Sequence, residues 1–197
     1  MERGDIHYFG DPLNLKKIFV IENINGRKIA FVNYNSFADP KFDEITSIIQ
    51  KLKSTVDYLV VYTHWGREYE LAENERQEKI AYQFIDTGAD LIIGSHPHVV
   101  QPVEIYKNKV IFYSLGNFVF DQYFSEDVKL ILGVGVLLGK DKVEFNLIPL
   151  YMQNSGQLQL MSKQQKQKFL QDLISRSKMN NAQKKEILNT EKIIIDN

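Results

Sequence analysis

The chain has 197 residues and no cysteine, and its 24 basic side chains nearly balance its 25 acidic ones. This length fits one domain with a substantial core, and the lack of cysteine excludes disulfides, thiolate ligands and a cysteine nucleophile. A net charge of −1 and the absence of an apolar run of roughly 20 residues argue against a nucleic-acid partner, an anionic membrane surface and a membrane span.

The first half of the chain alternates strand-like and helix-like segments. In chain order they are strand-like residues 19–22 and 28–34, helical residues 43–52, strand-like residues 58–62, helical residues 74–87 and strand-like residues 90–93. Asn25-Gly26 between the first two is a strong hairpin signal, and the continuous apolar runs at 58–62 and 90–93 are typical of strands buried on both faces. The strand–helix–strand–helix–strand order predicts an α/β fold with a parallel or mixed β-sheet.

From about residue 103 the predicted elements are strands joined by short turns. They are residues 103–106, 110–113, 130–138 and 143–150. This half predicts a β-meander that extends the first sheet or packs against it. Residues 164–174 and 182–188 are helical and rich in Lys and Gln, which favours a solvated surface element. We therefore expect a domain over residues 1–160 and a helical tail over 161–197.

Three of the four histidines follow the buried strand-like runs of the first half. His64 follows one run, and His96 and His98 follow the next. Because parallel strands bring their carboxyl ends to one edge of a sheet, we expect these imidazoles to reach one common point. Pro97 forces a turn, which lets the two rings beside it converge. Neutral imidazole is the commonest metal ligand, so the pattern predicts a divalent-metal site, the alternatives being a core histidine and two surface histidines.

Two polar residues lie where they could assist such a site. Glu68, four residues after His64, could be a general acid or base, a carboxylate supporting the ligands, or a plain surface charge. Asn117 follows a third strand-like run and could ligate metal, hydrogen-bond an oxyanion, or only complete a turn with Gly116. We take Glu68 and Asn117 as candidate catalytic residues, with Asp121 as the next available carboxylate. His7 has no strand before it and is left out of the predicted site.

The motifs around these residues resemble a known family. They are His64-Trp65-Gly66-Arg67-Glu68-Tyr69, the stretch from Asp86 to His98, Gln101-Pro102, and the stretch from Tyr113 to Gln122. In combination, order and spacing they resemble the CapA family of capsule synthesis, or poly-γ-glutamate biosynthesis, proteins. The fold of that family is similar to the calcineurin-like metallophosphoesterases. The resemblance covers roughly residues 10–150.

The resemblance implies a mixed sheet of metallophosphoesterase-like type with one or two divalent ions, Mn, Zn or Fe, at its carboxyl edge. His64 corresponds to the lone histidine motif of the superfamily, and His96 and His98 to its Gly-x-His-x-His motif. The family usually begins with a strand followed by Gly-Asp and then carries an Asn-Asn-His segment, and neither is found here. We therefore expect this chain to match the C-terminal part of the family domain and to lack those ligands, unless a neighbouring subunit or a separate segment supplies them.

Two functions follow from the resemblance. In the first, His64, His96 and His98 hold metal for hydrolysis of a phosphoester or related bond in a bacterial cell-envelope polymer, with Asn117 or Glu68 assisting. In the alternative, the chain is a catalytically inactive binding or assembly component of the capsule machinery. The expected partners are the capsule polymer or its synthesis machinery, and a second copy of the chain if an apolar sheet edge is left uncovered. The cell envelope is the expected location, although no signal peptide is recognisable in the sequence.

Overall fold

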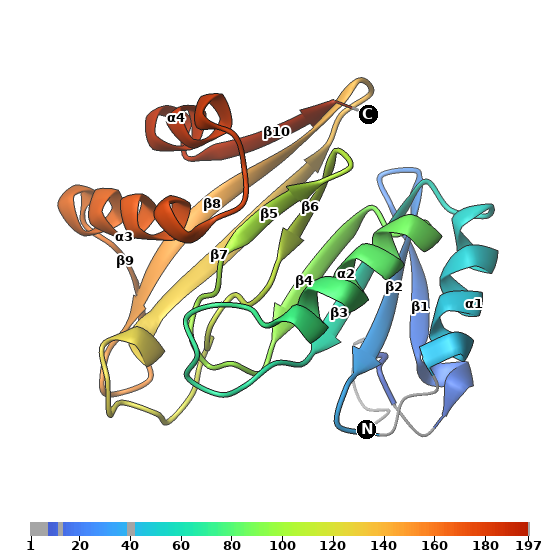
Figure 1. Ribbon diagram of the computed structural model, residues 1–197, viewed down its shortest axis with the longest axis horizontal. Helices are drawn as coiled ribbons and strands as arrows, with labels where there is room; N and C mark the ends of the chain where they lie inside the picture. Colours follow the sequence, from blue (N-terminus) through green and yellow to red (C-terminus); the bar gives the residue numbers. More distant parts are fainter. Residues whose placement is uncertain (1–7, 12–13, 39–41, 197) are drawn as a thin grey trace.

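The computed structural model describes residues 8–11, 14–38 and 42–196 (Figure 1). The first part comprises β1 (Phe19–Ile24), β2 (Arg27–Asn35), α1 (Phe42–Lys53), β3 (Tyr58–His64), α2 (Glu75–Thr87), β4 (Leu91–Ser95), β5 (Val103–Tyr106) and β6 (Lys109–Phe112). The second part comprises β7 (Leu130–Leu138), β8 (Lys142–Met152), β9 (Leu158–Leu160), α3 (Lys163–Arg176), α4 (Asn181–Thr190) and β10 (Lys192–Asp196). Short 3-10 helices lie at Leu15–Lys17 and Asp127–Lys129.

The strands form two separate sheets. The first has six strands in the order β1-β2-β3-β4-β6-β5, and the second has the order β10-β8-β7 with β9 paired to β8. In the first sheet β2, β3, β4 and β6 are parallel, while β1 and β5 pair antiparallel at its edges. The α/β class, the mixed sheet and the hairpin at Asn25-Gly26 are therefore confirmed.

Both faces of the first sheet are buried, which explains the continuous apolar runs of its central strands. Leu59 and Val61 of β3 pack in the core formed with α1 and α2. The alternate residues Tyr58 and Val60 pack in a second core, which the first sheet shares with the second sheet and α3. Because successive side chains of a strand point to opposite faces, a strand covered on both sides needs apolar residues at every position.

The predicted β-meander is divided between the two sheets. The β5–β6 hairpin extends the first sheet through parallel pairing of β6 with β4, whereas β7 and β8 pair with each other in the second sheet. Each of the four strands β5 to β8 was predicted within a few residues of its observed bounds. The pairing of β6 with β4 and of β8 with β10 joins strands that are not consecutive in the chain, so local periodicity could not assign the strands to their sheets.

The expectation that the C-terminal tail is a solvated surface element is wrong. One face of α3 is buried in the second core, with Phe169, Leu170, Leu173 and Ile174. The chain then returns as β10, which was not predicted and which pairs antiparallel with β8. In Figure 1 this tail lies against β8 and β5. The many Lys and Gln residues of the tail hide an apolar stripe at helical spacing, and that stripe determines its position.

No helix in the described part of the chain is long and apolar enough to cross a membrane.

Candidate metal centre

The candidate site lies on the two loops that follow β3 and β4. The register pairs His64 with Ser95, so these two strands end side by side at the same edge of the first sheet. Beyond β4 the chain turns sharply, with φ angles of 94° at His96 and 61° at His98. Residues other than glycine rarely adopt this left-handed region, and each such residue costs on the order of 1–3 kcal/mol. Strain of this kind at two histidines separated by one proline is typical of a ligand-binding turn.

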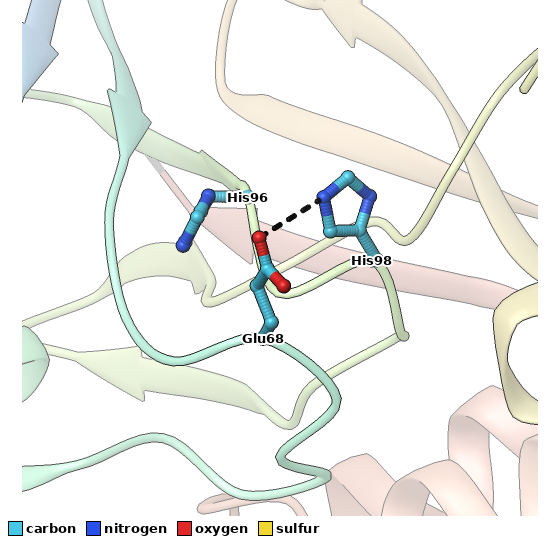
Figure 2. A group of neighbouring side chains, drawn as sticks. All are labelled: Glu68, His96 and His98. Atoms are coloured by element: carbon cyan, nitrogen blue, oxygen red, sulfur yellow. Dashed lines mark ion pairs between the residues drawn. The ribbon is translucent and has the colours of Figure 1, made fainter. Parts of the chain in front are cut away.

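Glu68, His96 and His98 converge at this edge (Figure 2). One possible ligand atom from each residue lies within 4.8 Å of the others. The Glu68 carboxylate points between the two rings, and its Oε1 is 4.0 Å from Nε2 of His98. Ligand atoms that share one ion at about 2.0–2.2 Å lie up to about 4.4 Å apart. Small side-chain rotations would therefore bring this group to coordinating distance.

His64 lies beside this group without belonging to it. Its ring centroid is 4.7 Å from that of His96, and its Nδ1 is 3.5 Å from the Ser95 hydroxyl. We predicted from the sequence that His64, His96 and His98 would hold the metal and that Glu68 would assist them. The group whose possible ligand atoms lie within 4.8 Å of one another contains Glu68 in place of His64. Asp121 is exposed and outside this set. His7 lies outside the described residues.

Burial and mutual repulsion keep two of the imidazoles neutral. Burial lowers the pKa of His64, and the neighbouring His96 and His98 lower it further. Burial also lowers the pKa of His96, and the raising effect of Glu68 only partly opposes it. Since both pKa values lie below the ordinary value for histidine, both rings are mainly uncharged at pH 7. The neutral ring is the form whose nitrogen lone pair can bind a metal ion.

Asn117 fixes the orientation of His98. The Asn117 Nδ2 donates to the carbonyl oxygen of Val128 at 3.2 Å, so its Oδ1 faces the other way. That oxygen lies 2.7 Å from Nδ1 of His98 and accepts a hydrogen bond from the Nδ1–H group. In the neutral form of the ring this hydrogen bond places the proton on Nδ1, so that Nε2, the atom that faces Glu68, carries the lone pair. With 6% of its surface exposed, Asn117 holds this position firmly.

Three aromatic rings that were not singled out from the sequence surround the histidines. The ring centroid of Phe37 is 4.4 Å from that of His96, and Phe120 and Tyr69 lie 5.1 Å and 5.9 Å from His98. Phe37, Phe120 and Tyr69 are all exposed. The only signal for them in the sequence was the position of aromatic residues next to polar ones. In the structure their exposure adds a second signal, because large apolar side chains at the surface often mark a binding site.

Residues 1–122 match the family described as "Bacterial capsule synthesis protein PGA_cap". The chain is similar to "Capsule biosynthesis protein CapA" of Bacillus anthracis, with 33% identity over 175 residues, 79% of this chain and 43% of that protein. It is also similar to "PGA biosynthesis protein CapA" of Bacillus subtilis (strain 168), with 51% identity over 85 residues, 43% of this chain and 22% of that protein.

The chain thus spans less than half the length of these curated relatives. Among solved structures, a hypothetical protein from Thermus thermophilus superposes with a TM-score of 0.43 and 18% identity. That match covers 74% of this chain and 60% of the other, and it is too distant to identify the fold type.

Proposed function

Because this chain belongs to the family of bacterial capsule synthesis proteins, we propose that Glu68, His96 and His98 form a divalent-metal centre that acts on a capsule polymer. The convergence of three donor atoms within 4.8 Å, on a turn strained at both histidines, supports the proposal. Two imidazoles and one carboxylate suit Zn, and they also suit Mn or Fe. The donor set therefore fits such an ion.

The proposed reaction is hydrolysis of a phosphoester or related bond in a cell-envelope polymer. A bound ion supplies a Lewis acid there and lowers the pKa of water. His96 offers a neutral nitrogen, and Asn117 keeps Nε2 of His98 available. His64, whose ring centroid is 4.7 Å from that of His96, is the further histidine that could help to hold the ion, and Glu68, with 48% of its side chain exposed, is the proposed ligand that is open to solvent.

A second function is favoured by the composition of the same group. In the described ranges the group holds a single carboxylate, which suits one ion and provides no bridge between two. A chain of this kind could bind the capsule polymer, or its synthesis machinery, without cleaving it. Turnover of a polymer substrate by the metal-loaded protein would decide between the two functions.

We expect the purified chain to bind one Mn²⁺ or Zn²⁺ ion, and Glu68→Ala or His96→Ala to weaken this binding by at least about 100-fold. Each substitution removes a ligand atom and leaves two. Calorimetric titration measures the affinity directly. The matched control is Glu70→Ala, an exposed glutamate on the same loop outside the group, which should bind as the unchanged protein does. If all three variants bind equally well, the metal centre is not here.

Asn117→Ala should weaken metal binding by about 10- to 100-fold, because His98 loses the acceptor that sets its tautomer. It should also destabilise the fold by about 1–3 kcal/mol, because the Val128 carbonyl loses its donor. Asn117→Asp keeps an oxygen facing His98 and should retain most of the affinity. Titration and urea unfolding of both variants separate these effects. A loss of stability in Asn117→Ala with undiminished affinity would contradict the positioning role.

A further inference from the structure

A cavity of about 960 Å³ adjoins the histidine site, between the loop that follows β2 and the first turns of α2. Two nearly buried aromatic residues, Tyr34 and Trp65, line it. Phe37 also lines it, and the ring of Phe37 lies against His96 on one side, at 4.4 Å, and His64 at 5.8 Å. The cavity and the candidate metal centre are therefore neighbours that share one wall.

The cavity carries an excess of positive charge. Arg67, Arg76 and Lys79 line it, against one carboxylate, Glu75. Within the part of the chain that the structure describes, no ion pair involves any of the three cations, although other exposed cations such as Lys107 have carboxylate partners. Since the whole chain has a net charge of −1, this local excess is not a consequence of its composition.

Helix α2 places two of the three cations at the cavity. Burial raises the pKa of the Tyr34 hydroxyl, the nearby Arg76 guanidinium partly opposes this rise, and the N–H groups of Arg76 can donate to a ligand. Arg76 and Lys79 lie one turn apart on α2 and so share a face of the helix. The amino-terminal end of α2, capped by Asn74, borders the same cavity and adds its partial positive charge.

We propose that this cavity is an anion-binding subsite that recognises a multiply charged segment, carrying carboxylate or phosphate groups, of the molecule on which the metal centre acts. The assignment of that segment to the substrate rests on the proposed function. Arg67 is adjacent in sequence to Glu68, so one short loop supplies both the metal centre and the cavity. A flexible acidic chain with its reacting bond at the histidines would place its neighbouring charges beside Arg67, Arg76 and Lys79.

The test measures binding of two probes, a synthetic glutamate oligomer and inorganic tripolyphosphate, by calorimetry at low salt in the presence of EDTA. We expect the full chain to bind at least one probe, and Arg67→Ala/Arg76→Ala to weaken that binding by about 10-fold or more, because two charge-assisted contacts are lost. Preference for one probe identifies carboxylate or phosphate as the recognised group. The matched control is Lys168→Ala/Lys185→Ala, which removes the same charge from exposed positions of α3 and α4.

The outcome can be separated from that of the metal proposal, because EDTA removes any metal ion before probe binding is measured. The subsite stands if the arginine variant alone loses affinity, even if the chain binds no metal. It is overturned if the unchanged chain binds neither probe, or if both double variants lose affinity equally. Circular dichroism should confirm that all variants are folded, since the substituted side chains are exposed.

Discussion

Gly94→Ala should destabilise the protein by about 3 kcal/mol or more, because no space exists for the added methyl group. A Cβ atom at Gly94 would lie 1.9 Å from the carbonyl oxygen of Tyr113 and 2.6 Å from Nε1 of Trp65. Both neighbours are fully packed, and the Trp65 Nε1 donates to that same carbonyl at 2.8 Å. The substitution must therefore break this hydrogen bond or push β4 away from β6.

Urea unfolding of the variant measures this loss, and Gly135→Ala is the matched control. Gly135 also lies within a strand, β7, but its added Cβ would meet only the Cβ of Asn146, at an ordinary 3.7 Å. Because Gly94 precedes His96 by two residues, we also expect weaker metal binding in any folded fraction of the first variant. Similar unfolding midpoints for the two variants would contradict the packing at Gly94.

Asp90→Ala should destabilise the fold by about 2–3 kcal/mol from the opposite end of β4. The Asp90 carboxylate is 4% exposed and accepts from Lys53 at 2.6 Å, from Lys109 at 2.9 Å and from the Leu59 amide at 2.9 Å. The two lysines are partly exposed and can turn to water after the substitution. The buried Leu59 amide cannot, so it is left without its side-chain acceptor.

The control for Asp90→Ala is Asp86→Ala. Asp86 also pairs with a lysine, Lys107, but both side chains are exposed, so its loss should change the stability by less than about 1 kcal/mol. Unfolding in urea measures both variants. Metal affinity should be unchanged in each, because Asp90 precedes β4 and the candidate site follows it. If Asp90→Ala unfolds like Asp86→Ala, the buried carboxylate does not stabilise this end of the sheet.

The sequence alone was sufficient for the elements of the first half and for the location of the histidines. The turn at Asn25-Gly26, the apolar runs at 58–62 and 90–93, and the position of His64 after the first run all depend on consecutive residues. Turn chemistry and periodicity are local properties, so they can be predicted without knowing the rest of the fold. The family resemblance rested on the same contiguous motifs and is confirmed by the match over residues 1–122.

Other features depended on contacts between distant segments, and only the tertiary structure decided them. The apolar stripe of α3 has the spacing of any amphipathic helix. It is buried only because β7 and β8, from another part of the chain, contribute to the same core. Glu68 is exposed on a loop, and only the turn at His96 and His98 brings two imidazoles to its carboxylate. Asn117 contacts His98 across 19 positions of sequence. Spacing along the chain was enough to predict these side chains as candidates. Their contacts depend on how the two sheets stack, which local patterns do not specify.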